Sequence, residues 1–181
     1  MENVLIAYFS HRGENYLNGR IVDLKRGNTE IVAQKIAERT GGNLYRIETV
    51  RDYPSGYEAC TRIARQELEE NARPRLINNM KDLERYDTIF LGYPNWWGTM
   101  PMAVWTFLES YDFTHKRLVP FCTHEGSGAG RSIADIRKLA PAAIVMPGMA
   151  LRGGDAARSD REIEKLIGAI NRDAFLSDDL K

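Results

Sequence analysis

Two short stretches near the N-terminus carry residues that suit the binding of a phosphate group. Ser10-His11-Arg12-Gly13 follows an apolar run, and Gly27-Asn28-Thr29 stands at the start of a predicted helix. A phosphate needs several hydrogen-bond donors in a concave arrangement, and the free N–H groups of a helix N-terminus supply some of them. We expect residues 14–26 to loop out as an insertion and to leave Ser10 and Thr29 adjacent in space.

The same residues are compatible with two alternative roles. Residues 10–15 could form the whole cradle alone, or Asn28 and Thr29 could merely cap a helix, since caps favour these residue types. Neither a G-x-G-x-x-G fingerprint nor the Gly-Lys-Ser/Thr of a P-loop is present. The pattern therefore disfavours a P-loop nucleotidase.

Aromatic and small residues after two later apolar runs suit the binding of a flat ring. Pro94-Asn95-Trp96-Trp97-Gly98 places two indoles at the end of a predicted strand, and Thr123-His124-Glu125-Gly126-Ser127-Gly128 is small, polar and rich in glycine. Indoles stack on planar heteroaromatic rings, and glycines let the backbone approach the polar edge of such a ring. We expect the two loops to hold a ring between them. The alternatives are a pair of core tryptophans and a plain surface turn at 123–128.

The side chains that could do other chemistry form no familiar catalytic pattern. The three histidines stand in no zinc-site spacing such as H-E-x-x-H. Ser127 has Glu125 where a nucleophile elbow needs glycine. Cys60 and Cys122 form no C-x-x-C pair, so we expect two reduced, inert thiols. The sequence predicts no metal site and no hydrolase triad.

Apolar runs alternate with amphipathic stretches along the chain, which predicts strands that alternate with helices. Ser159 and Glu162 fit a capping box at the start of the last predicted helix. Residues from about 173 to 181 are expected to form a frayed tail. The predicted strands are 4–9, 44–50, 88–93, 118–122 and 142–146. The predicted helices begin near Thr29, Tyr57 and Pro101, around Ile133, and after Ser159.

Five strands joined by right-handed helical crossovers predict an α/β fold with a parallel sheet covered on both faces. In doubly wound sheets, ligands bind beyond the carboxyl ends of the strands, at the switch point of the strand order. The loops after the first, third and fourth predicted strands meet at that edge. We therefore expect the phosphate cradle and the two ring loops to form one site.

Length and composition fit a single globular domain spanning residues 1–181. Of the 181 residues, 43% are hydrophobic and 28% are charged, and 25 basic residues balance 25 acidic ones. A net charge of zero argues against a nucleic-acid partner. No apolar run is long enough to cross a membrane, and the N-terminus lacks a basic segment and a cleavage site. We expect a cytoplasmic protein.

The motifs quoted above, together with Tyr8-Phe9-Ser10, resemble those of the flavodoxin-like superfamily over residues 3–170, and most of all its short bacterial flavodoxin-type proteins. The resemblance implies a three-layer α/β/α fold with strand order 2-1-3-4-5 and non-covalently bound FMN at the carboxyl edge. It implies that Ser10, Asn28 and Thr29 hold the phosphate, and Arg12 is counted with them. It implies that residues 94–98 and 123–128 hold the isoalloxazine ring. The interrupted phosphate loop and the missing acidic bias depart from the usual family pattern.

An FMN protein of this kind moves electrons through its flavin and needs no catalytic side chain. The neutral surface favours an NAD(P)H-dependent reductase of quinones or similar acceptors, acting as a monomer or homodimer. The alternative is a one-electron carrier that docks on protein partners. A third possibility is a binding module that kept the fold and lost the flavin. Residues 14–26 are expected to form a lid, a partner contact or an inert surface loop.

Overall fold

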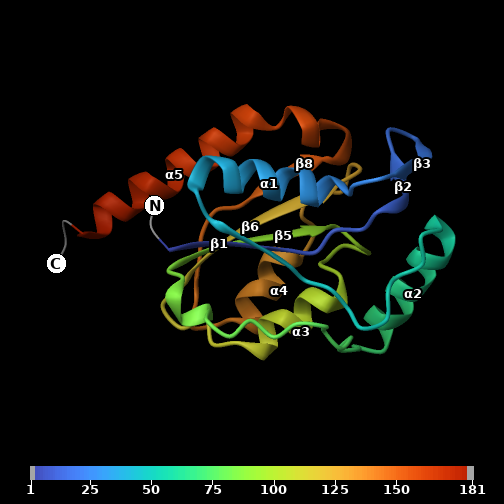
Figure 1. Cartoon of the computed structure of the whole chain (residues 1–181), viewed down its shortest axis with the longest axis horizontal. Helices are drawn as coiled ribbons and strands as arrows, with labels where there is room; N and C mark the ends of the chain where they lie inside the picture. The colour runs from blue at the N-terminus through green and yellow to red at the C-terminus, as the bar shows by residue number, and fades with distance from the viewer. Residues whose placement is uncertain (1–2, 179–181) are drawn as a thin grey trace.

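The computed structural model describes residues 3–178, with side chains described as far as Arg172. It has one layer of strands between two layers of helices (Figure 1). The main sheet is six-stranded and its paired strands are all parallel. In spatial order its strands are β4 (Asn43–Arg46), β1 (Val4–Tyr8), β5 (Thr88–Pro94) and β6 (Arg117–His124), and β6 then pairs with β7 (Ile144–Val145) and with β8 (Met149–Arg152).

Two helices cover each face of this sheet, and a fifth lies at its rim (Figure 1). Figure 1 shows α1 and α5 on one face and α3 and α4 on the other, whereas α2 lies at the rim beyond the carboxyl ends of the strands. The α-helices are α1 (Asn28–Thr40), α2 (Tyr57–Glu69), α3 (Met102–Ser110), α4 (Ser132–Leu139) and α5 (Asp160–Asp178). Two short 3-10 helices are η1 (Leu83–Arg85) and η2 (Gly153–Arg158).

Strand β1 shows why this sheet is central. All five of its residues are buried, as expected for a parallel strand that is covered on both sides. Val4, Ile6 and Tyr8 face the core beneath α1 and α5, and the alternate residues Leu5 and Ala7 face the core above α3 and α4. Full burial of each such leucine or isoleucine stabilises the folded chain by roughly 1.5–3 kcal/mol. Because its side chains alternate between the two cores, β1 contributes to both of them.

The predicted strand order 2-1-3-4-5 is confirmed, but the strand count is six instead of five. The fifth position holds two pieces, because β7 pairs with the first half of β6 and β8 with its second half. Pro147 and Gly148 separate the pieces. Proline has no N–H for the ladder, and a side chain at Gly148 would place its Cβ 2.5 Å from the Pro120 carbonyl oxygen.

The second predicted strand, 44–50, ends earlier than expected. β4 stops at Arg46, and the chain then crosses to pair with residues 75–77. Thr49 and Leu76 form an isolated antiparallel bridge, flanked by a 2.8 Å hydrogen bond from the Val50 N–H to the Arg75 carbonyl. The stretch 44–50, whose polarity alternates, therefore pairs first with β1 and then with residues 75–77.

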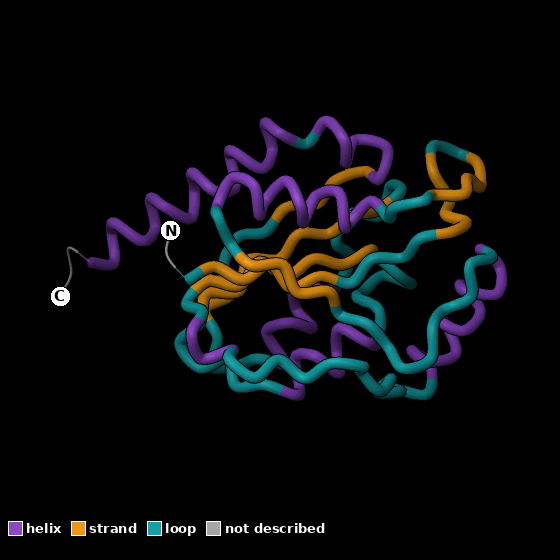
Figure 2. Tube along the Cα trace, viewed as in Figure 1, coloured by secondary structure: helices purple, strands orange, loops and turns teal. Residues whose placement is uncertain are grey.

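Residues 14–26 mostly form a β-hairpin, which the sequence pattern did not predict. The hairpin consists of β2 (Gly13–Leu17) and β3 (Arg20–Leu24), which pair with each other and not with the main sheet. Its turn uses Asn18 and Gly19, both with positive φ, as a two-residue turn of type I′ requires. Figure 2 shows the hairpin set apart from the main sheet, at the end where α2 lies.

The start of α5 also differs from the prediction. Ser159 directly precedes the helix, but its hydroxyl donates a 2.8 Å hydrogen bond to the Ala156 carbonyl in η2. The hydroxyl therefore donates to the preceding turn, and among the described residues no capping-box hydrogen bond joins Ser159 and Glu162. The backbone of residues 173–178 continues α5, and residues 179–181 of the predicted tail lie outside the described residues. Within the described part of the chain, no helix has the length and apolarity needed to span a bilayer.

Candidate functional site

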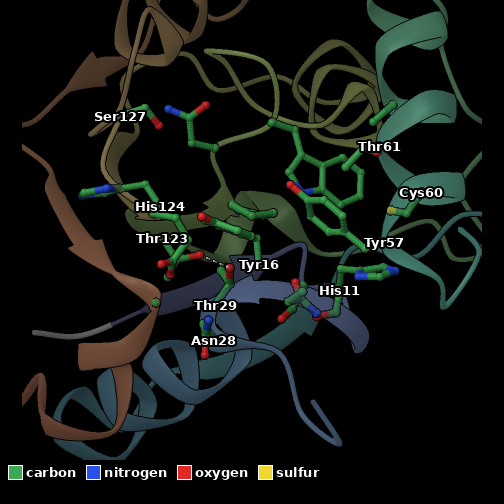
Figure 3. A pocket seen from close by; sticks show the side chains of 18 of the residues that line it. His11, Tyr16, Asn28, Thr29, Tyr57, Cys60, Thr61, Thr123, His124 and Ser127 are labelled. Carbon is green, nitrogen blue, oxygen red and sulfur yellow. Dashed lines mark hydrogen bonds between the residues drawn. The ribbon is translucent and has the colours of Figure 1, made fainter. Parts of the chain in front are cut away.

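A cavity of about 390 Å³ lies at the carboxyl ends of β1, β5 and β6. Figure 3 shows side chains from segments far apart in the sequence around it, with Cys60 and Thr61 from α2 on one side and Thr123 and His124 on the other. The predicted site residues that line it are Ser10, Asn28, Thr29, Pro94, Asn95, Trp96, Trp97, Thr123, His124, Glu125, Gly126 and Ser127.

Both halves of the predicted cradle meet at the N-terminus of α1. The Ser10 hydroxyl accepts a 3.1 Å hydrogen bond from the Glu30 N–H, and the Thr29 and Thr123 hydroxyls lie 2.8 Å apart. The insertion does loop out, so Ser10 and Thr29 come together as expected. The Glu30 N–H is thus used, and the Asn28 and Thr29 N–H groups, which have no partner within the helix, remain as donors at this end of the cavity.

Three predicted residues lie outside the cavity lining. Arg12 lines a neighbouring space of about 240 Å³ that also contains Glu48 and Asp52. Gly98 and Gly128 act instead on Asn95: the Gly98 N–H donates to its side-chain oxygen at 2.9 Å, and its side-chain nitrogen donates to the Gly128 carbonyl at 2.7 Å. These two glycines therefore fix the loops that line the cavity without lining it themselves.

The two tryptophans of the third loop have different environments. Trp96 is partly buried and meets Phe9 and Tyr53 edge to face, with ring centroids 5.2 and 5.1 Å apart. Trp97 is 47% exposed and has a positive φ of 54°. Its indole N–H donates a 3.0 Å hydrogen bond to the Thr61 carbonyl of α2. Trp96 thus belongs partly to the core, whereas Trp97 bridges the loop and α2 across the cavity rim.

Three further lining residues, His11, Glu14 and Asn15, belong to the alternative cradle of residues 10–15. The lining residues that were not predicted as site residues come from the hairpin, from α2 and from the start of η2, and they are Tyr16, Tyr57, Cys60, Thr61, Ala64 and Gly153. No local pattern indicates that α2 lies at the rim instead of over the sheet. The one sequence feature that could have indicated that the hairpin lines the cavity was Tyr16, an aromatic residue within an insertion that interrupts the phosphate motif.

The hairpin is tied to both sides of the cavity. On one side, the Glu14 carboxylate accepts a 2.9 Å hydrogen bond from the Tyr57 N–H at the N-terminus of α2. On the other, the Asn18 N–H donates to the Glu125 carboxylate at 3.0 Å. The Tyr16 and Tyr57 rings lie 6.2 Å apart between these two ties. The hairpin therefore forms a strap from α2 to the 123–128 loop.

The two thiols of the chain, of which only that of Cys60 lines the cavity, are poor nucleophiles. Both cysteines are free and buried, and burial raises the pKa of each thiol to about 12, with a further contribution from Glu67 at Cys60. A thiol with such a pKa is protonated near neutral pH. Among the residues that the structure describes, no three His, Cys, Asp or Glu side chains gather in a way that could hold a metal ion.

His11 is held as a neutral imidazole at the cavity wall. Burial lowers its pKa, because desolvation disfavours the charged ring, and hydrogen bonds to Pro54 and Asn15 oppose this shift. Its Nε2 lies 2.9 Å from the Pro54 carbonyl oxygen. Since a carbonyl only accepts, Nε2 carries the proton and Nδ1 holds the lone pair.

This environment predicts a pH-dependent stability. The pKa of His11 is lower in the folded chain than its ordinary value of 6.5, so below that value the unfolded chain binds more protons. The free energy of unfolding should therefore fall from about pH 7.5 to about pH 5.5, and His11→Gln should reduce this fall. Urea unfolding of both proteins at the two pH values measures the difference. Equal losses in the two proteins would contradict the assignment.

The sequence model of the flavodoxin family matches residues 21–167. No curated protein matches the sequence. A protein from Bacteroides eggerthii, assigned as a flavoprotein, is 26% identical over 93% of this chain and 98% of its own, with a TM-score of 0.73. A similarly assigned protein from Bacteroides uniformis is 25% identical over 90% and 97%, with a TM-score of 0.69.

A flavoprotein from Lactobacillus acidophilus, whose structure is a complex with FMN, shares the fold. It is 19% identical over 87% of this chain and 98% of its own, with a TM-score of 0.63. The family model covers most of the present chain, including α1, both ring loops and the start of α5. The chain therefore belongs to the flavodoxin family.

Proposed function

We propose that this chain binds FMN in the cavity and uses it to transfer electrons, most simply as an NAD(P)H-dependent reductase of quinones or similar flat acceptors. Membership of the flavodoxin family and the similar structure in complex with FMN support FMN as the cofactor. The single observation that carries the proposal is that one cavity is lined both by a helix N-terminus with hydroxyls and by two tryptophans.

The hydrogen-bond donors at the phosphate end of this cavity suit a phosphate dianion. The N-terminus of α1 bears a partial positive charge, and Asn28 and Thr29 are its first residues. Thr29 is only 1% exposed, and its hydroxyl pairs with that of Thr123. The residues present can hold a phosphate without a basic side chain, because backbone N–H groups supply the donors.

The ring end fits a flat heteroaromatic system. Trp96 and Trp97 supply indole surface, and Tyr57 and Tyr16 add further aromatic surface from α2 and the hairpin. A cavity of about 390 Å³ falls within the range typical of small-molecule sites. The flavin supplies the redox chemistry when bound, and the surrounding residues orient it and exclude water from it.

Two features of the cavity rim favour different electron acceptors. The strap formed by the hairpin restricts entry to the cavity, which favours a small acceptor and hence a reductase. The exposed Trp97 is the specific feature that supports the second candidate, a one-electron carrier, because it offers an aromatic contact to a protein partner. The balanced charge of the chain lacks the electrostatic attraction that many docking partners use, so we place the reductase first.

Steady-state oxidation of NADH or NADPH by the FMN-loaded protein, with and without a soluble quinone, tests the proposal. A reductase should show quinone-dependent oxidation that requires FMN. Absence of turnover with every quinone and dye tested, together with reversible reduction of the bound flavin, would favour the carrier. A protein that binds no FMN under any condition would contradict both candidates.

Trp97 should contribute to ring binding through its stacking surface. Trp97→Ala should weaken FMN affinity by about tenfold, equal to about 1.4 kcal/mol, because it removes the indole from the rim and its tie to Thr61. Trp97→Phe keeps an aromatic face and should recover part of the affinity. Flavin fluorescence quenching measures both variants. Wild-type affinity in Trp97→Ala would remove this residue from the site.

A further inference from the structure

The loop of residues 123–128 contains a hydrogen bond between two of its own residues. The backbone N–H of Gly126 donates to Nδ1 of the His124 imidazole at 2.9 Å, across one intervening residue. Gly126 has a positive φ of 136°, so the chain turns here in a conformation that other residues rarely adopt. The His124 side chain therefore closes this turn, as the side-chain oxygen of asparagine or aspartate does in an Asx-turn.

This turn forms part of the cavity wall. His124, Glu125, Gly126 and Ser127 all line the cavity, and Figure 3 shows His124 on the side opposite α2. Glu125, which lies inside the turn, accepts the hydrogen bond from the Asn18 N–H and so anchors the hairpin strap. The bond between Gly126 and His124 therefore fixes both a stretch of the wall and one end of the strap.

The two ends of the loop are held independently of His124. The Asn95 N–H donates to the Thr123 carbonyl at 2.8 Å, and the Asn95 side-chain nitrogen donates to the Gly128 carbonyl at 2.7 Å. Loss of the bond to His124 would thus release the middle of the loop between two fixed ends. A segment of this kind can change its conformation while the sheet stays folded.

Only the neutral imidazole can accept the bond from Gly126. A neutral histidine has one ring nitrogen with a lone pair, and here it is Nδ1, so Nε2 carries the proton. In the imidazolium both ring nitrogens are donors, so the Nδ1–H would face the Gly126 N–H. Protonation of His124 therefore replaces an attraction by a repulsion at the same position.

Two charged groups among the described residues act on His124. Arg152 of β8 is its register partner across the strands. Burial lowers the pKa of the imidazole, and the Arg152 guanidinium lowers it further, whereas Glu125 opposes this shift from within the loop. His124 is only partly buried, so protons from solvent reach it. These surroundings favour the neutral imidazole near neutral pH.

Resting on the function proposed above, we propose that His124 is a pH-sensitive latch: its neutral imidazole holds Gly126 and the cavity wall in place, and its imidazolium releases them and lowers the affinity for the flavin. His124 acts in this way as a positioning residue, through the loop. The pKa of the imidazole is lower in the closed loop than its ordinary value of 6.5, so the open loop binds a proton more readily. Acid therefore favours the open loop, and the affinity falls as the pH is lowered.

The pH dependence of riboflavin binding tests this latch. Riboflavin is the probe because, unlike FMN, it has no phosphate that titrates near pH 6. Its affinity for the wild type should fall between about pH 7 and about pH 5, by roughly three- to tenfold for the loss of one hydrogen bond. His124→Asn should lose this fall, since an asparagine oxygen accepts from the N–H two residues on and does not titrate. His11 is present in both proteins, so the difference between them isolates His124.

Two further variants separate the latch from a general effect of charge. His115→Asn is the matched control: His115 is exposed, precedes β6 and has a φ of 62°, which asparagine tolerates. It should keep the wild-type pH profile. Arg152→Gln removes the guanidinium beside His124, so the fall should begin at a higher pH. A purely structural role of Arg152 would leave the midpoint where it is.

Nuclear magnetic resonance of the flavin-free protein follows the latch itself. His124 should be protonated at Nε2 near neutral pH, and the Gly126 amide signal should shift with the same midpoint as the His124 ring. A Gly126 signal that does not follow His124, or equal pH profiles of riboflavin affinity for the wild type and His124→Asn, would overturn the proposal. Wild-type protein that binds no riboflavin at neutral pH would instead count against the proposed function, and the Gly126 signal would still decide the latch.

Discussion

Replacing Gly27 with alanine should weaken FMN binding by roughly ten- to a hundredfold, with much smaller effects on the affinity for lumiflavin. Gly27 precedes α1, and a Cβ there would lie 2.3 Å from the Ser10 hydroxyl oxygen and 2.4 Å from the His11 carbonyl oxygen. Its φ of −70° is accessible to any residue, so the effect is one of space and not of backbone strain. The methyl group must separate the loop after β1 from α1 and so open the phosphate end.

Gly56→Ala is the matched control for this variant. Gly56 stands in the same position before α2, with a similar φ of −75°, but a Cβ there meets only the Glu14 carboxylate at an ordinary 3.7 Å. Its FMN affinity should stay close to that of the wild type. Equal FMN affinities for Gly27→Ala and Gly56→Ala would show that the phosphate does not bind where β1 meets α1.

Gly92→Ala should lower the free energy of unfolding by roughly 3 kcal/mol, at the upper end of what overpacking a core costs. Gly92 lies in β5 opposite Phe121 of β6, and a Cβ there would lie 2.2 Å from the Phe121 ring. The ring is 1% exposed and has no free space to move into. The clash therefore forces β5 and β6 apart just before both ring loops.

Urea unfolding measures this effect, and Gly168→Ala supplies a control of opposite sign. Gly168 lies within α5, where a Cβ would meet only the Arg172 guanidinium at 3.6 Å. Alanine has the higher helix propensity, so Gly168→Ala should stabilise the chain by roughly 0.5–1 kcal/mol. Similar unfolding midpoints for Gly92→Ala and the wild type would mean that the sheet is not closely packed at Phe121.

The parts of the fold that the sequence predicted are those with local signals. The continuous apolar run of β1 indicated a central parallel strand, and the chemistry of the loops after β1, β5 and β6 indicated a shared edge. The strand order rested on resemblance, and it is confirmed once β7 and β8 are taken as one position. Trp96 and Trp97 could not be told apart, because their different burial depends on the distant partners Phe9 and α2.

The parts that were missed depend on contacts between distant segments. The amphipathic pattern of α2 is compatible with packing on the sheet, yet the helix lies at the rim and supplies a cavity wall. The hairpin carries the Asn18-Gly19 turn, but its role as a strap arises from Glu14 and Glu125, which bind it from opposite sides. The spacing of Ser159 and Glu162 fitted a capping box, but the Ser159 hydroxyl donates its hydrogen bond to the preceding 3-10 turn.

The cavity at the carboxyl edge of the sheet is central to everything proposed for this chain, because it is where FMN should bind. Titration of FMN into the flavin-free protein, followed by absorbance and by flavin fluorescence, tests this most directly. We expect saturation at one FMN per chain, with quenched fluorescence and a shifted flavin band, both weakened in Gly27→Ala. A spectrum that stays that of free FMN at every protein concentration, or binding that Gly27→Ala and Trp97→Ala leave unchanged, would contradict it.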